Sequence, residues 1–292
     1  MLTTSPAPLE QQPLPRAESR SGWRFVLLAA VGAVAAISMI PFVYLLVRAS
    51  DKPIDEIIQL LFRQKTLEVL ATTASLVVCV VVINLVLGVA IASGLHFVQL
   101  PFRRLLIIPA VLPLAIPSYV FTYTWVALVP SFSGFAAAVF ILSISTIPYI
   151  ILATLAGLRS IDGSQIEVAR SLGLNPVQTF SRVVFPQIRG HVSAGALLVG
   201  LYTMSDFGAV SLLNVETLTV SIQNMYRASY DRSAAAVISF VLIAFSILFV
   251  MANESISGRS TSNQLLKSLS VKTPQIQKAY LKVATVLMIV AF

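Results

Sequence analysis

The chain has 292 residues, of which 57% are hydrophobic and 11% charged, and its formal net charge is +8. Soluble domains carry about 25% charged residues, so this composition excludes an ordinary water-soluble globular protein. The long, continuously apolar runs also exclude the short alternating strands of a membrane β-barrel. The sequence therefore predicts an all-α fold, a polytopic bundle of transmembrane helices.

The chain begins with a polar tail and a first apolar stretch. Residues 1–23 contain four prolines and no apolar pattern, so we expect a disordered cytoplasmic tail. Residues 25–47 are uncharged and longer than the apolar region of a signal peptide, which predicts a retained span. Apolar residues at helical spacing between Asp51 and Lys65 predict an amphipathic helix on the outer surface.

Further apolar stretches predict about six spans in all. Residues 105–158 are uncharged and too long for one span, and the segment 130–134 supplies a break. The expected later spans are residues 69–95, 105–128, 134–158, 191–213 and 234–252. The expected transmembrane domain is thus 24–256. Residues 257–292 are expected to be a cytoplasmic linker and the start of a seventh span, either truncated or continued by a second half.

The distribution of basic residues predicts the orientation in the membrane. With the N-terminus in the cytoplasm, 14 of the 20 Lys and Arg residues lie in cytoplasmic segments and 6 in outer segments. The positive-inside rule therefore places both the N-terminus and residues 159–190 in the cytoplasm. Topology explains the positive charge, and nucleic acid is not an expected partner.

Residues 159–190 form the longest cytoplasmic loop between spans and have the pattern of two short helices. Ser164 and Glu167 have the spacing of a capping box at the start of the first helix. Gly173 can adopt the positive φ that ends this helix.

The second helix of the loop is expected to begin with Asn175 as its cap and Pro176 as its first residue, and to end at Pro186. Each helix has an apolar face. These faces are expected to contain Ile166, Ala169 and Leu172 in the first helix, and Val177, Phe180, Val183 and Val184 in the second. Such a loop either packs on its own membrane domain or docks a partner protein.

The loop contains, in order, Glu167, Ala169, Gly173, Phe180 and Pro186. Their types and spacing resemble the EAA loop of ABC-importer permeases, which reads Glu-Ala-Ala, three residues, Gly, and a hydrophobic stretch ending near Leu-Pro. Val168 replaces the middle alanine and Phe185 the leucine, and both keep the apolar character. The resemblance implies a multi-pass permease of the bacterial inner (plasma) membrane.

The resemblance also implies partners and residue roles. The loop would sit in a cleft of a cytoplasmic ABC ATPase dimer, with Glu167 as a polar contact, Ala169 as a close-packed surface and Gly173 as the turn. Glu167 also fits a purely capping role. A second permease half and a periplasmic or surface solute-binding protein would complete the importer. The partner ATPase would bind ATP, since this chain has no phosphate-binding loop.

Two further segments resemble the iron(III)-type branch of these permeases. One is Met204-Ser-Asp206-Phe207-Gly208, and the other contains prolines at every fourth position followed by Ser-Tyr-Val. This branch includes thiamine and polyamine relatives, and many of its members fuse two halves in one chain. It implies iron(III) as the substrate, with thiamine, polyamine or another small solute as alternatives.

Some residues inside the expected spans are candidates for the transport pathway. Asp206 either faces a cavity or partner, or pairs near the outer interface with Arg227 or Arg232. A helical stripe would act either as a hinge lining the pathway or as a bend for packing. Its members are Pro109, Pro113, Pro117, Tyr119 and Tyr123. Small residues of the fifth span predict close packing, within the bundle or between two halves.

The sequence contains no catalytic set and no metal-binding cluster, so we expect neither an enzyme nor a cofactor. The alternative class is a secondary transporter or channel that works alone. Such a protein would more often carry several ionisable residues inside its spans for ion coupling.

Overall fold

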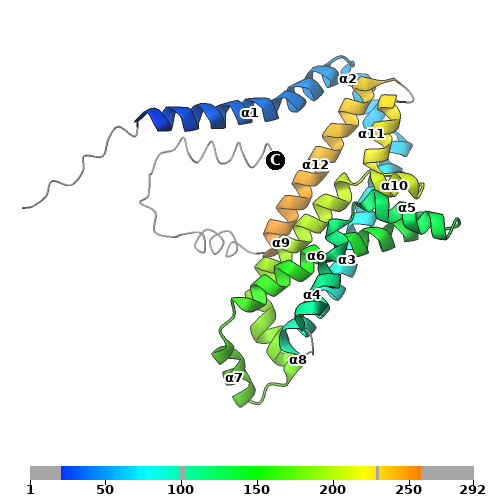
Figure 1. Cartoon of the computed structure of the whole chain (residues 1–292). Helices are drawn as coiled ribbons and strands as arrows, with labels where there is room; N and C mark the ends of the chain where they lie inside the picture. The colour runs from blue at the N-terminus through cyan, green and yellow to red at the C-terminus, as the bar shows by residue number, and fades with distance from the viewer. Residues whose placement is uncertain (1–20, 99–102, 228–229, 258–292) are drawn as a thin grey trace, which may run out of the picture. The chain divides into compact units, whose positions relative to one another are not determined.

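The computed structural model describes residues 21–98, 103–227 and 230–257, which form helices and turns without a strand (Figure 1). The all-α prediction is confirmed for this part of the chain. The chain divides into two compact units, one of Met1–Tyr44 with Pro274–Phe292 and one of Leu45–Thr273. Most of the predicted tail 1–23 and the predicted linker and seventh span at 257–292 lie outside the described residues.

Residues 21–44 of the first unit belong to helix α1 (Ser21–Ser50), which contains the predicted first span. Pro41 lies inside this helix, where its missing N–H removes one backbone hydrogen bond. The segment Val26–Ser50 is long and apolar enough to cross a membrane.

The described part of the second unit contains three further helices of membrane-spanning length and apolarity. They are α3 (Gln64–Phe97), α6 (Phe135–Arg159) and α12 (Arg232–Ser257). They match the predicted spans at 69–95, 134–158 and 234–252. The predicted amphipathic helix is also present as α2 (Ile54–Leu61), which contains no buried residue.

The predicted span at 105–128 is bent rather than straight. It consists of α4 (Arg103–Val111), the 3-10 helix η1 (Leu112–Ala115) and α5 (Ser118–Leu128), with a bend of 97°. Pro117 has extended backbone angles (φ −58°, ψ 137°) and precedes α5. Proline cannot donate the hydrogen bond that would continue a helix, and it disfavours helical angles in the residue before it, which explains the break between η1 and α5.

The predicted span at 191–213 is shifted along the chain. Helix α9 runs over Phe185–Ser205 and ends where Asp206 takes an extended ψ of 127°. The remaining residues form the short helix α10 (Gly208–Leu212), which precedes α11 (Leu218–Arg227). The prediction of a continuous span through residue 213 was wrong, because Asp206 starts a new turn.

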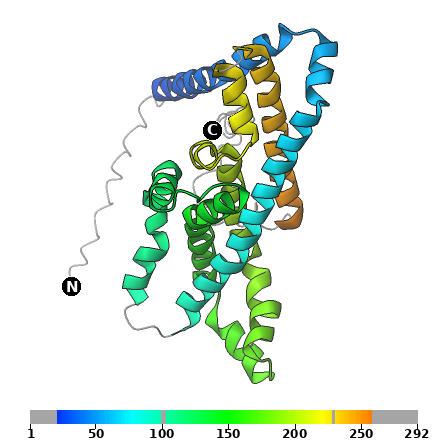
Figure 2. The same cartoon turned by 90° about the vertical axis from the view of Figure 1, so that its right-hand side faces the viewer.

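Helices α3, α6 and α9 pack side by side in the centre of the second unit (Figure 2). Ile150 of α6 lies against two glycines. A Cβ on Gly88 would come within 2.7 Å of the Ile150 side chain, and one on Gly195 within 3.2 Å of the Ile150 backbone. A side chain at Gly88 would force Ile150 to shift, and one at Gly195 would be tight, so these small residues serve packing within this chain.

Candidate functional site

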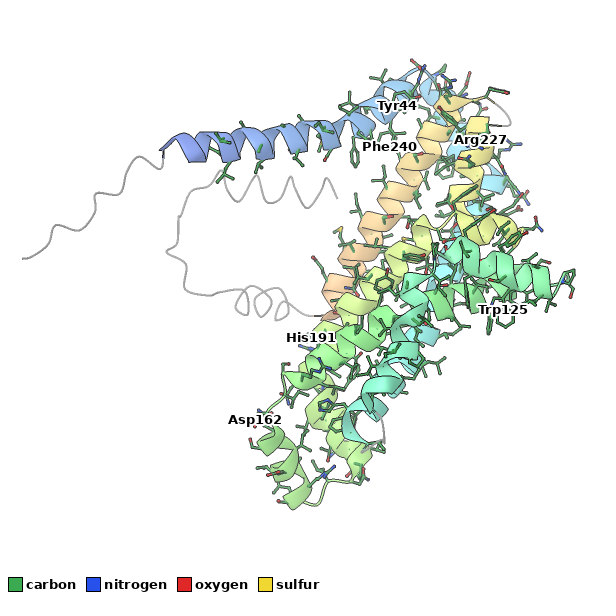
Figure 3. The ribbon with its side chains drawn as sticks, in the orientation of Figure 1. Tyr44, Trp125, Asp162, His191, Arg227 and Phe240 are labelled. Carbon is green, nitrogen blue, oxygen red and sulfur yellow. The ribbon has the colours of Figure 1, made fainter. Side chains whose placement is uncertain are left out.

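The first helix of the loop at 159–190 is α7 (Gly163–Ser171), and its cap is Asp162, labelled in Figure 3. The Asp162 carboxylate accepts hydrogen bonds from the Ser164 backbone N–H (3.0 Å) and hydroxyl (2.8 Å). These two bonds hold the pKa of Asp162 below its usual value, and the bond from the backbone N–H has the larger effect. The predicted capping box of Ser164 and Glu167 was wrong, because Asp162, two residues closer to α6, caps the helix start.

Gly173 ends α7 in the left-handed conformation that the sequence predicted, with φ of +82°. Its N–H donates to the Arg170 carbonyl (2.9 Å), and the Leu174 N–H donates to the Ala169 carbonyl (3.2 Å). This pair of bonds is the Schellman motif. A Cβ on Gly173 would meet no atom within 4 Å, so the backbone angle alone requires glycine here.

The second helix, α8 (Pro176–Thr179), begins as predicted at Asn175 and Pro176. The Asn175 side chain accepts from the Gln178 N–H (2.8 Å), and the Gln178 side chain accepts from the Asn175 N–H (3.1 Å). This reciprocal capping box fixes the direction of α8 against α7.

Pro186 does not end the second helix. The chain continues from α8 through a π-helical turn, η2 (Phe180–Val184), into α9, of which Phe185 and Pro186 are the first residues. The Phe185 N–H donates to the Phe180 carbonyl in the wider π pattern. Because proline lacks an N–H and crowds the carbonyl four residues before it, a widened turn lets the helix pass the proline without a break.

The loop is packed onto the ends of α6 and α9. Ile166 and Phe180 contact a buried cluster made by Leu158, Val184, Ile188 and Val192. Ala169 is only 4% exposed, so it packs inside the folded loop and presents little surface of its own to a partner. This packing holds α7 and α8 in one arrangement on the membrane domain.

The opposite side of the loop is apolar and exposed. Leu172, Val177 and Val168 are 78%, 76% and 59% exposed, although Leu172 and Val177 were predicted to lie on the same faces as buried residues. Val168 and Leu172 lie one helical turn apart, on the same side of α7. Glu167 is also exposed, and its carboxylate has no hydrogen-bond or ion-pair partner among the residues that the structure describes. We call Glu167, Val168, Leu172 and Val177 the docking face.

The proline and tyrosine stripe is spread over three elements. Pro109 lies in α4, Pro113 in η1, and Pro117 precedes α5, so the prolines do not share one helix face. Tyr119 and Tyr123 are 51% and 62% exposed on α5. A Cβ on Gly208 would lie 2.9 Å from the Cβ of Tyr119, which places α10 directly against α5.

Asp206 connects four elements. It is 8% exposed, and one carboxylate oxygen accepts from the Ala209 (2.9 Å) and Val210 (3.4 Å) N–H groups at the start of α10. The other oxygen accepts from the Ser118 hydroxyl of α5. The Asp206 carbonyl accepts from the Thr219 hydroxyl of α11 (2.8 Å). The predicted pairing of the Asp206 carboxylate with Arg227 or Arg232 was wrong, because the N–H and hydroxyl donors named above satisfy its charge.

Replacing Asp206 tests whether its role is structural. We expect Asp206→Ala to lower stability by about 2–4 kcal/mol, because the cap of α10 and the buried contact to the Ser118 hydroxyl are lost. Asp206→Asn keeps an acceptor for the Ala209 N–H and should lose less. The measurement is thermal unfolding of the detergent-purified chain. If Asp206→Asn unfolds like the original protein but abolishes transport, the carboxylate acts in the pathway instead.

Ion pairs hold the end of the second unit that lies away from the loop. Lys52 pairs with Asp231 (3.1 Å) and Lys65 with Glu216. Asp231 also accepts from the Ala234 N–H at the start of α12 (2.9 Å), and this bond is the main cause that lowers the pKa of Asp231. The hydrogen bond to Asp231 is the main cause that raises the pKa of Lys52.

A buried polar contact between α3 and α6 was missed by the sequence reasoning. The Asn84 side chain is fully buried and donates to the Thr146 hydroxyl (2.6 Å), which donates to the Leu142 carbonyl (2.6 Å). The sequence signal for this contact was an asparagine inside an otherwise apolar run. A polar side chain in a span is expected to have a polar partner on a neighbouring helix.

Comparison with known proteins finds one family whose profile covers the loop and most of the central helices. The family profile described as "Binding-protein-dependent transport system inner membrane component" matches residues 84–261. The Fe(3+)-transport system permease protein FbpB 2 of Haemophilus influenzae is 33% identical over 239 residues. The match covers 82% of this chain and 47% of that protein, so the chain spans about half of the relative's length.

Other relatives differ in what their names say they transport. The chloroplastic sulfate permease 2 of Chlamydomonas reinhardtii is 27% identical, covering 79% of this chain and 68% of that protein. Among solved structures, a chain of a bacterial alginate ABC transporter in complex with an alginate-bound periplasmic protein has a TM-score of 0.66 at 14% identity. That match covers 82% of this chain and 96% of the other, and it shows a shared fold.

Proposed function

The chain belongs to the family of binding-protein-dependent transport system inner membrane components, and from this premise we propose that it forms half of the translocation pathway of an ABC importer. In this proposal a separate cytoplasmic ATPase dimer supplies the energy. A second permease half completes the pathway, and a solute-binding protein delivers the substrate. The alternative of a stand-alone transporter or channel receives no support from the family match.

The docking face is the single observation that carries this proposal. A folded loop that buries Ala169 yet exposes Leu172 and Val177 has an apolar surface that no described residue covers. Largely exposed apolar side chains beside the Glu167 carboxylate fit a protein–protein contact, in which a few central residues dominate the binding energy. The proposed orientation, with six spans and a cytoplasmic N-terminus, presents this face to the ATPase.

Iron(III) is the proposed substrate. The relative named for Fe(3+) transport is more similar than the relative named for sulfate, at 33% against 27% identity. The segment around Asp206 and the prolines at 109, 113 and 117 also resemble the iron(III)-type branch. Thiamine, polyamine, sulfate and other small solutes are the competing substrates.

Reconstitution tests both parts of the proposal. The chain is co-expressed with its genomic neighbours, and an ATPase subunit is expected to co-purify with it through a tag on this chain. The complex is then reconstituted in proteoliposomes, with iron(III) and the binding protein added on the outer side. Iron(III) should accumulate only when ATP is present on the side of the membrane where the ATPase lies. ATP-dependent uptake of sulfate but not iron would leave the importer proposal standing and overturn the substrate. Uptake without any ATPase would overturn the importer itself.

A further inference from the structure

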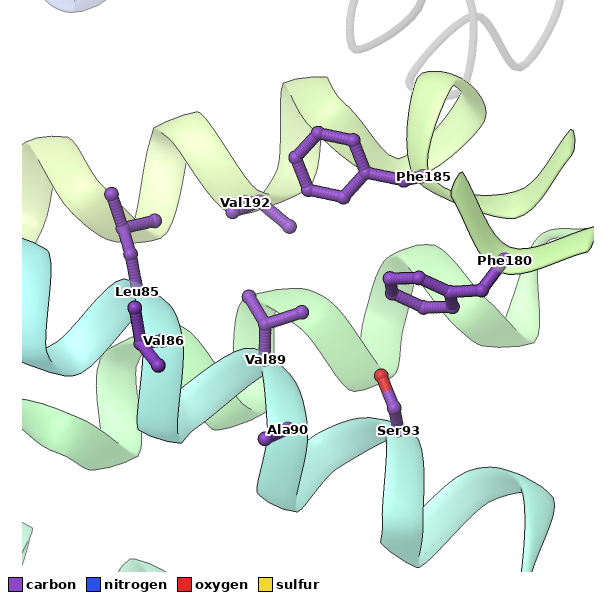
Figure 4. Close-up of a pocket in the computed structure, with 8 residues that line it drawn as sticks. All are labelled: Leu85, Val86, Val89, Ala90, Ser93, Phe180, Phe185 and Val192. Atoms are coloured by element: carbon purple, nitrogen blue, oxygen red, sulfur yellow. The ribbon is translucent and has the colours of Figure 1, made fainter. Parts of the chain in front are cut away.

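An apolar groove lies between α3 and the start of α9, next to the base of the loop (Figure 4). Its volume is about 450 Å³, within the range of about 300–1,000 Å³ typical of small-molecule sites. Val86, Val89 and Ala90 line it from one face of α3. Phe185 and Val192 line it from α9, and Phe180 from η2. Of the side chains that line this groove, Ser93 alone is polar, and its hydroxyl has no hydrogen-bond partner among the described residues.

A positive charge emerges from the same face of α9. Arg189 lies four residues after Phe185 and three before Val192, so these three side chains occupy one side of the helix. Arg189 is exposed, and no ion pair or hydrogen bond of its guanidinium is found within residues 21–98, 103–227 and 230–257. Side chains on a helix tilt toward its N-terminus, which directs Arg189 toward the loop and away from the bundle.

We propose that this groove binds an anionic phospholipid, with an acyl chain along Val86, Val89 and Ala90 and the headgroup phosphate at Arg189. The apolar lining suits the acyl chain, and the charge of Arg189 is complementary to the headgroup. Basic pockets between transmembrane helices at the cytoplasmic side bind anionic headgroups in this manner. The bound lipid would contact both η2 and α3 and so stabilise their arrangement at the base of the loop at 159–190. The inference uses the proposed orientation but not the transport activity.

Native mass spectrometry of the detergent-purified full chain tests this site directly. Phosphatidylglycerol and phosphatidylcholine with identical acyl chains are titrated separately, and we expect tighter binding of phosphatidylglycerol. Arg189→Gln should weaken phosphatidylglycerol binding about fivefold, which corresponds to about 1 kcal/mol per basic residue near the membrane surface. Arg189→Lys should retain most of the binding. Arg170→Gln is the matched control, since it removes an exposed arginine of the loop that is not on the groove face.

Filling the groove tests the acyl-chain half of the proposal. Ala90→Phe should lower binding of both lipids, whereas Val78→Phe should change neither, because Val78 is exposed and lies about two turns before the first groove residue of α3. Size-exclusion profiles report whether each variant stays folded. Equal binding of the two lipids, an equal effect of Arg170→Gln, or unchanged binding in Ala90→Phe would each overturn the proposal. If Ala90→Phe leaves lipid binding intact but prevents association with a second permease half, the groove is a protein interface instead.

Discussion

Replacing Gly173 with valine is expected to abolish transport while membrane insertion continues. The backbone at this position has φ of +82°, and a β-branched residue there is strained by about 1–3 kcal/mol. The turn between α7 and α8 would relieve the strain by moving to another conformation. Leu172 and Val177 lie on either side of this turn, so the docking face would lose its shape. The measurement is ATP-dependent uptake by the reconstituted complex, with membrane fractionation to follow insertion.

Two matched variants separate backbone conformation from side-chain bulk. A Cβ on Gly163, at the start of the same helix, also meets no atom within 4 Å, but Gly163 has no positive φ. Gly163→Val should therefore transport far better than Gly173→Val. Gly173→Asn should recover part of the activity, because asparagine tolerates left-handed angles. Normal transport by Gly173→Val would show that the loop is not the coupling element.

The second large effect is expected from Leu172→Glu, which should prevent the ATPase from co-purifying. Leu172 is 78% exposed, so the substitution disturbs no packing within the folded chain. Burying an uncompensated carboxylate in an apolar contact costs several kcal/mol of binding free energy. The central residues of a protein interface each contribute at least about 2 kcal/mol to that free energy. We expect ATPase recovery to fall by about thirtyfold or more.

The control for Leu172→Glu is an equally exposed apolar side chain elsewhere. Tyr230 is 81% exposed in the connection between α11 and α12, and Tyr230→Glu should leave ATPase recovery unchanged. Leu172→Met keeps the apolar contact and should bind nearly as well as the original chain. Full ATPase recovery with Leu172→Glu would mean that Leu172 does not enter the interface.

Local signals in the loop were sufficient to predict the end of α7 and the start of α8. Gly173 and Asn175 act through their own backbone angles and through bonds to residues three or four positions away, so a single sequence reveals them. The start of α7 was misplaced because Asp162 and Ser164 both suit a cap, and the choice depends on where α6 ends. Pro186 was misinterpreted because a π-helical turn leaves no clear pattern in the sequence.

Non-local contacts limited what the sequence could show of the candidate sites. Two partners of Asp206, the hydroxyls of Ser118 and Thr219, lie 88 and 13 positions away in the sequence, and no spacing rule connects them. Helical periodicity grouped Leu172 with Ala169, yet one is exposed and the other buried. Periodicity identifies an apolar face, but only the packing of η2 and α9 decides which apolar residues remain free.

Site-directed cross-linking from the docking face tests the central claim most directly. Cys79 is the single cysteine of the chain, so Cys79→Ala gives a background in which Leu172→Cys or Tyr230→Cys carries one thiol. Each thiol is labelled with a photoreactive maleimide in the assembled complex and irradiated. A cross-link to the ATPase from position 172, and none from position 230, is the predicted result. The absence of an ATPase adduct at position 172, or equal adducts at both positions, would contradict the assignment of this loop as the site where the ATPase binds.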